Sequence, residues 1–155
     1  MNPFNGKTVA VLIDTNVAYT YLSGRDDPYS QAARDVMSLC AHGEVQGFLA
    51  FHSLSTIWYL TRKMPIAIRR GWLMRMCKVL TVTGASHAQI IDAIQREDFS
   101  DFEDCLQDKC AKESGCDFIV TANVKDFSHS EIPAITPNQL MELVSAKIGD
   151  DGCDA

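Results

Sequence analysis

The sequence predicts an α/β protein whose central, mostly parallel sheet of about five strands is covered by helices on both faces. Apolar, β-branched runs alternate along the chain with segments of helical periodicity, which is typical of βαβ units. The first run, TVAVLI at 8–13, is continuously apolar, as expected of a strand buried on both faces. A chain of 155 residues suits one domain. We therefore expect that domain over 1–146 and a polar, acidic tail over 147–155.

Capping and turn residues set the expected element boundaries. Ser53 and Ser86 are suited to cap the N-termini of two helices, and Gly115 is suited to follow the end of a third. Pro65 and Pro137 each suit the first turn of a helix. The expected strands are 8–13, 48–51, 78–83, 117–122 and 134–136. The expected helices are 15–22, 29–42, 53–62, one that starts near 65 and includes Met76, 86–94, 101–114 and 137–144.

Composition excludes several classes of protein. With 46% hydrophobic and 22% charged residues, the chain is not disordered throughout. Its N-terminal apolar run has about six residues, far fewer than the roughly 18 that span a bilayer, so we expect a cytoplasmic protein without a membrane partner. Six cysteines form no CxxC pair and four histidines stand apart, so no zinc or redox motif is present. We expect reduced thiols, with Cys105 on a buried helix side and Cys153 free in the tail.

The net charge of −6 argues against a protein that holds nucleic acid by general electrostatic attraction. Any contact with nucleic acid must therefore be local. One basic concentration exists, in a predicted helical region, and comprises Arg62, Lys63, Arg69, Arg70, Arg75 and Lys78. It is either an RNA-facing patch or a solvated helix face, and the sequence leaves both interpretations open.

Polar residues follow two of the predicted strands. The first strand runs into residues 14–16, Asp-Thr-Asn, and the fourth into residues 121–123, Thr-Ala-Asn. The carboxyl ends of parallel strands meet at one edge, so these groups would be neighbours if the two strands pair. Between them, Asp101, Asp104 and Asp108 are spaced to share one helix face, and Asp101 and Asp104 can both point to that edge.

These acidic residues have two interpretations. Acids in the first turn of a helix can simply cap it, which is worth roughly 0.3–2 kcal/mol. Two carboxylates about 4 Å apart, however, repel by roughly 4 kcal/mol at an effective dielectric of 20, so convergence of Asp14 with this helix would imply a bound cation. Oxygen ligands favour Mg²⁺ or Mn²⁺, which can polarise a phosphoryl oxygen and activate water. The implied reaction is hydrolysis of a phosphodiester.

Other catalytic schemes have less support. The chain contains no GxSxG, GxxxxGK[ST] or GxGxxG motif. A phosphatase with an aspartyl nucleophile would usually carry a second acid two residues after Asp14, where this chain has Asn16. Three histidines that could act as bases have no partner nearby in the sequence, and we expect structural roles for His52, His87 and His129.

Three segments together are specific: VLIDTNV at 11–17, DFEDCLQ at 101–107, and DFIVTANVKDF at 117–127 followed by Thr136-Pro137. In this order they resemble the PIN-domain family of metal-dependent ribonucleases, which includes the VapC-like toxins of bacterial toxin–antitoxin pairs. The resemblance covers residues 8 to about 144. It implies the three-layer α/β/α, Rossmann-like PIN fold and a Mg²⁺- or Mn²⁺-dependent endoribonuclease.

The resemblance also assigns roles to residues. Asp14 and Asp104 would be metal carboxylates, with Asp101 a further ligand or a group that orients water. Asn123 matches a position where many relatives carry a fourth acid, and Asp126 could compensate as a metal ligand. The residues expected to orient ligands or bind the scissile phosphate are Thr15, Asn16 and Thr121.

One departure from the family pattern matters. The helix after the second strand begins in many PIN domains with a glutamate ligand, and here the same stretch offers Ser55 or Thr56. With Asn123 in place of the fourth acid, the site loses up to two negative charges, so metal binding would be weak or dependent on substrate phosphate. The alternative function is a catalytically degenerate PIN-like module that binds RNA or protein without cutting.

The resemblance implies partners as well as RNA. If the chain is a toxin, a small antitoxin should cover the acidic edge through an Arg or Lys. Tyr19, Tyr21 and Leu22 would form such an interface or a homodimer, or else belong to the core.

Overall fold

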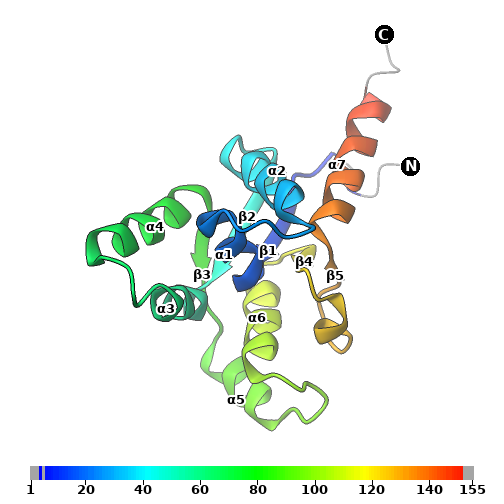
Figure 1. The fold of residues 1–155 in the computed structure, drawn as a ribbon. Helices are drawn as coiled ribbons and strands as arrows, with labels where there is room; N and C mark the ends of the chain where they lie inside the picture. The colour runs from blue at the N-terminus through cyan, green and yellow to red at the C-terminus, as the bar shows by residue number, and fades with distance from the viewer. Residues whose placement is uncertain (1–3, 5, 152–155) are drawn as a thin grey trace.

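A five-stranded sheet with the order β3-β2-β1-β4-β5 forms the centre of the computed structural model, which describes residues 4 and 6–151 (Figure 1). β1 (Val9–Ile13) pairs with β2 (Val45–Ala50) on one side and β4 (Phe118–Val120) on the other. The edges are β3 (Thr81–Thr83) and β5 (Ala134–Ile135). Every pair is parallel, which confirms the predicted sheet. The pairing of β1 with β4 meets the condition under which the polar groups that follow these strands become neighbours.

In the described part of the chain, six α-helices lie between the strands and a seventh follows the last strand, and several of them have the local signals expected. Ser86 forms a capping box with Gln89, and Gly115 has the positive φ of +64° that lets the chain turn directly after a helix. The α-helices are α1 (Thr15–Ser23), α2 (Ser30–Ala41), α3 (Phe51–Leu60), α4 (Ile66–Val79), α5 (His87–Gln95), α6 (Phe102–Glu113) and α7 (Pro137–Asp151); a 3₁₀ helix, η1, covers Val124–Phe127.

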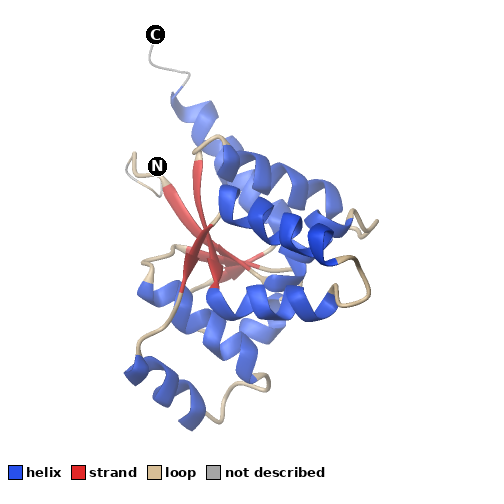
Figure 2. Ribbon diagram, turned by 90° about the vertical axis from the view of Figure 1, so that its left-hand side faces the viewer, coloured by secondary structure: helices blue, strands red, loops and turns tan. Residues whose placement is uncertain are grey.

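The helices form a layer on each face of the sheet (Figure 2). Val9, Val11 and Ile13 of β1 belong to a core shared with α1, α2, α3, α4 and α7, whereas the alternate residues Ala10 and Leu12 pack with α6 and η1. α5 packs against α6. Because side chains alternate across a strand, one continuously apolar strand supplies both cores. The three-layer α/β/α fold is thus confirmed.

Some boundaries differ from those expected. The apolar run that predicted a strand at 48–51 belongs to β2 only as far as Ala50, and Phe51 begins α3, because an apolar run alone does not distinguish a strand from a buried helix. Ser53 therefore lies inside α3 and does not cap it. α4 continues to Val79 and shortens β3, and α7 extends to Asp151. Residues 152–155 of the expected tail lie outside the described residues.

Four of the five described cysteines and several apolar side chains are buried, whereas Cys77 is exposed. Five cysteines are free, and Cys105 is buried; Cys153 lies outside the described residues. Leu22 is buried and Tyr21 packs against the core, so the core interpretation holds for these two residues. Tyr19 is partly buried, with its ring 6.5 Å from that of Trp72. None of the helices in the described range is long and apolar enough to cross a membrane.

Asp108 does not share an exposed face with Asp101 and Asp104. It is fully buried and accepts hydrogen bonds from the backbone N–H groups of Glu131 and Ile132, both at 3.0 Å. It also lies 3.9 Å from Arg96. This carboxylate therefore anchors the segment before β5.

We expect Asp108→Ala to lower the free energy of unfolding by about 2–4 kcal/mol, because two buried N–H groups and a guanidinium would lose their acceptor. Urea denaturation would measure the change. Glu113→Ala, on the exposed side of the same helix, should change stability by less than about 0.5 kcal/mol. Equal effects of the two substitutions would contradict the anchoring role.

Candidate metal site

The candidate site lies where the chain reverses its direction of travel across the sheet. From β1 the chain adds β2 and β3 on one side, and then returns to add β4 and β5 on the other. The backbone N–H of Asp14 donates to the carbonyl of Val120 at 2.9 Å, which holds the ends of β1 and β4 together. In open parallel sheets, ligands bind in the crevice at such a switch point.

Asp14 is fixed at the base of this crevice. Its Oδ1 accepts from Nε2 of Gln107 and its Oδ2 from Oγ1 of Thr121, each at 2.8 Å. Only 5% of the residue is exposed. Burial raises the pKa of the Asp14 carboxyl above its ordinary value, and the hydrogen bonds from Gln107 and Thr121 act in the opposite direction. The two donors hold the carboxylate in one orientation.

The first turn of α6 adds three acids to the crevice. Asp101 caps the helix, because its Oδ1 accepts from the N–H groups of Glu103 at 2.8 Å and Asp104 at 3.2 Å. The capping interpretation is therefore correct for Asp101, which nevertheless faces the pocket. Glu103 reaches across to α3, where its Oε1 accepts from Oγ1 of Thr56 at 3.1 Å.

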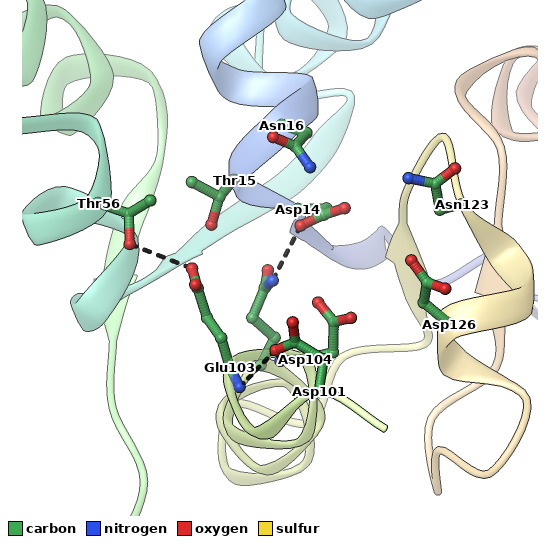
Figure 3. Close-up of a pocket in the computed structure, with 10 residues that line it drawn as sticks. Asp14, Thr15, Asn16, Thr56, Asp101, Glu103, Asp104, Asn123 and Asp126 are labelled. Carbon is green, nitrogen blue, oxygen red and sulfur yellow. Dashed lines mark hydrogen bonds between the residues drawn. The ribbon is translucent and has the colours of Figure 1, made fainter. Parts of the chain in front are cut away.

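The resulting pocket has a volume of about 170 Å³ (Figure 3). Thr56 lies at one side, and Asn123 and Asp126 lie at the opposite side. Five of its ten lining residues carry carboxylates and none is basic. The lining residues are Asp14, Thr15, Asn16, Thr56, Asp101, Glu103, Asp104, Gln107, Asn123 and Asp126.

The crowded negative charge has its strongest effect on Asp104. Burial, followed by the charges of Asp14, Asp101, Asp126 and Glu103, raises its pKa to about 7 from the ordinary 3.8. A carboxyl group must be deprotonated to bind a metal. The positive charge of a bound cation would lower the pKa of Asp104 and so oppose the effect of the neighbouring carboxylates. The pocket therefore has the electrostatics of a cation site.

The donor set fits a hard cation. The lining residues offer carboxylate, amide and hydroxyl oxygens and no thiol or imidazole. Oε1 of Gln107 is buried without a hydrogen-bond partner, so an acceptor remains free beside Asp14. Among the described residues, no three acids, histidines or cysteines already converge at metal-binding distances. An ion would therefore have to draw the carboxylates inward against their mutual repulsion.

Eight of the ten predicted site residues line the pocket: Asp14, Thr15, Asn16, Thr56, Asp101, Asp104, Asn123 and Asp126. Thr121 is fully buried, so its hydroxyl orients Asp14 and does not face a substrate phosphate. Ser55 is exposed and does not line the pocket, because adjacent helical residues point in different directions. Of the two hydroxyls proposed for α3, only Thr56 reaches the site.

Sequence reasoning missed Glu103 and Gln107. Gln107 follows Asp104 by three residues, so helical spacing places it on the same face, and this signal was available. Glu103 had no such signal. It is adjacent to Asp104 in the chain, and it enters the pocket only because α3 packs close enough for Thr56 to bind it.

We expect Gln107→Met to weaken Mn²⁺ binding about tenfold, because it removes a donor to Asp14 and the free acceptor beside it. Calorimetry would measure the affinity. Gln95→Met changes an exposed glutamine on α5 and is the matched control. Wild-type affinity in a folded Gln107→Met protein would reduce Gln107 to a packing role.

Comparison with known proteins gives one family match. A family model described as a PIN domain matches residues 10–125, a range that includes all three resembling segments up to Lys125. A search of curated proteins finds no significant match.

Solved structures share the fold at low identity. VapBC2 from Rickettsia felis, bound to a DNA fragment from its promoter, aligns with a TM-score of 0.63 and 14% identity, covering 83% of this chain and 98% of that one. The Mycobacterium tuberculosis toxin VapC20, which cleaves the sarcin-ricin loop, aligns with a TM-score of 0.52 and 19% identity, covering 70% of this chain and 86% of that one. PAE2754 from Pyrobaculum aerophilum gives 0.56 and 16%, covering 93% and 96%.

Proposed function

The chain belongs to the PIN-domain family, and from this premise we propose that it is a Mg²⁺- or Mn²⁺-dependent endoribonuclease. The observation that carries the proposal is the pocket at the carboxyl edge of the sheet, which is lined by five carboxylates and no basic residue. Such a pocket attracts a cation, and a hard cation suits a phosphate substrate. RNA is the proposed substrate class.

Each residue has a proposed task. Asp14 and Asp104 would hold the ion, which when bound would polarise a phosphoryl oxygen and lower the pKa of an attacking water. Gln107 and Thr121 keep Asp14 oriented through their hydrogen bonds. Asp101 and Asp126 would add ligands to the ion, and Asp101 could instead orient water. The remaining polar lining residues, Thr15, Asn16, Thr56 and Asn123, would orient ligands or the scissile phosphate.

Glu103 offers a replacement for the glutamate expected on α3. The hydrogen bond from Thr56 holds the Glu103 carboxylate against α3, at the side where the family pattern expects that acid. We propose that α6 supplies the missing negative charge through Glu103. Metal binding should then weaken strongly in Glu103→Gln, which removes the charge, and less in Thr56→Val, which removes only the hydroxyl that positions the acid.

The proposal can be tested in two steps. Calorimetric titration of EDTA-treated protein with Mn²⁺ should show saturable binding. Incubation with a 5′-labelled RNA of mixed sequence should then give internal cleavage with Mn²⁺ or Mg²⁺ and none with EDTA. Absence of binding by the folded protein up to millimolar Mn²⁺ would overturn the metal-nuclease proposal.

A module that binds RNA or protein without cutting is the second candidate. It is favoured by the hydroxyl of Thr56 and the amide of Asn123, which line the pocket at positions where the family pattern described above implies acids. Such a module would bind its ligand equally well with Mn²⁺ and with EDTA. A metal-independent affinity together with intact RNA after prolonged incubation would select this function.

We extend the proposal to the toxin of a toxin–antitoxin pair. The fold is shared with VapC20, whose described role is that of a toxin. An inhibiting antitoxin would place an Arg or Lys among the pocket carboxylates, and binding of such a partner should compete with Mn²⁺. A homodimer would bury exposed apolar residues such as Phe51 and Ile94, and sedimentation of the purified chain would reveal it.

A further inference from the structure

Charge is strongly segregated along this chain. Residues 45–91 contain six Lys and Arg residues and no Asp or Glu, whereas the other 108 residues carry eight basic and all 20 acidic side chains, a net charge of −12. The net charge of −6 therefore conceals one local region of positive charge.

The six basic residues all belong to the α3–α4 arm, which we define as residues 51–79. Five of them are exposed and Arg69 is partly buried. None forms an ion pair with a described residue, in contrast to Arg25, Arg96, Lys109 and Lys112. In Figure 1 the arm lies at the side of the molecule away from α7. Its charge is thus available to a ligand.

The arm is continuous with the acidic pocket. Thr56 lines the pocket, and Tyr59 follows three residues later on the same side of α3. The Tyr59 side of the helix is open, since 63% of this residue is exposed. The guanidinium of Arg62 lies 4.3 Å from the centre of the Tyr59 ring. An aromatic ring and a cation therefore stand one helical turn outside the pocket.

Arg69 keeps the arm together. Its guanidinium lies 3.6 Å from the centre of the Trp58 ring and donates to the Trp58 carbonyl at 2.7 Å, which ties α4 to α3. The other cations near this junction, Arg62, Lys63 and Arg70, are exposed. These three residues are the ones able to reach a ligand.

We propose that the α3–α4 arm binds single-stranded RNA and leads it into the pocket, with Arg62, Lys63 and Arg70 contacting phosphates and Tyr59 stacking on a base. The inference rests on the proposed function for RNA as the ligand. Basic grooves combined with aromatic stacking platforms are typical of single-strand binding. The arm's direct continuity with a phosphate-type site favours RNA over an acidic protein segment, and the acidity of the rest of the chain leaves RNA few other surfaces.

The first test removes charge from the arm. The triple variant Arg62→Gln, Lys63→Gln, Arg70→Gln is compared with Lys7→Gln, Arg34→Gln, Lys147→Gln, which changes net charge equally outside the arm. Fluorescence anisotropy of a labelled single-stranded RNA is measured in EDTA, so that no cleavage occurs. We expect the RNA affinity of the arm variant to fall at least about tenfold. The slope of log affinity against log salt concentration should become shallower by about 2, since each phosphate contact on a single strand contributes roughly 0.7 to that slope.

The control variant should lose no more than about threefold in affinity. Equal losses in the two triple variants would overturn the proposal, because only net charge would then matter. Binding of a polyglutamate peptide that is stronger than RNA binding and is lost in the arm variant would overturn it in favour of an acidic protein partner.

The second test addresses Tyr59. Tyr59→Leu removes the stacking ring and should weaken RNA binding about five- to tenfold, whereas Tyr59→Phe should retain wild-type affinity. Equal affinity of Tyr59→Leu and Tyr59→Phe would remove the stacking role from the proposal.

Calorimetry with Mn²⁺ separates this inference from the proposed function. The arm variants should bind Mn²⁺ like the wild type, because none of the substituted residues lines the pocket. If the protein binds RNA through the arm but does not cleave it, the arm proposal is supported and the nuclease proposal is rejected. If the protein cleaves RNA and its arm variants bind RNA like the wild type, the arm proposal is rejected and the nuclease proposal is supported.

Discussion

Asp14→Asn is expected to abolish both Mn²⁺ binding and RNA cleavage while the protein stays folded. Loss of a group that only supports a metal ligand typically costs 10–100-fold, so loss of the central ligand should cost at least about 100-fold. Calorimetry and a cleavage assay under identical conditions would measure the two losses.

The variant should remain folded for a local reason. Asparagine has the shape of aspartate, Thr121 can still donate to its oxygen, and the Gln107 amide can turn so that its oxygen accepts from the new NH₂ group. Asp35→Asn, on α2, is a control that should retain both activities. Unchanged cleavage by Asp14→Asn would show that the activity comes from another site or another protein.

Asp104→Asn should have opposite effects on metal binding and on stability. The folded state raises the pKa of Asp104 to about 7 from 3.8. Ionisation of this carboxyl therefore lowers the free energy of unfolding by its full amount above pH 7, by part of that amount between pH 7 and pH 4, and not at all below pH 4. Removing the charge should therefore stabilise the metal-free protein at pH 8. We expect a gain of about 1 kcal/mol, because solvent around the partly exposed carboxylate screens the repulsion.

Urea denaturation in EDTA at pH 8 and pH 5 would measure this gain, which should shrink at the lower pH. With Mn²⁺ present the wild type should be more stable than Asp104→Asn, since only the wild type gains stability from the bound ion. Glu113→Gln, an exposed substitution on the same helix, should change neither result. A destabilised Asp104→Asn protein at pH 8 in EDTA would contradict the repulsion that we infer in the pocket.

The basic residues show how far the sequence alone reaches. Their concentration is visible in the sequence, but whether it faced RNA or only solvent was left open there. The structure adds that none of the six basic residues has an acidic partner among the described residues. It also places Tyr59 on α3 between Thr56, at the pocket, and Arg62, which lies over its ring. Those relations depend on how α3 and α4 pack, which no spacing rule gives.

By itself, the sequence determined the α/β class and the common helix face of Asp101 and Asp104, because apolar runs and helical period are local patterns. It brought Asp14 to them only on the condition that the first and fourth strands pair, and the structure shows that pairing. Only the tertiary structure decided the roles of neighbouring residues. Thr121 became a buried partner of Asp14, Ser55 turned away, and Glu103 entered the pocket through Thr56. These outcomes depend on ångström-scale distances between elements that are far apart in the chain.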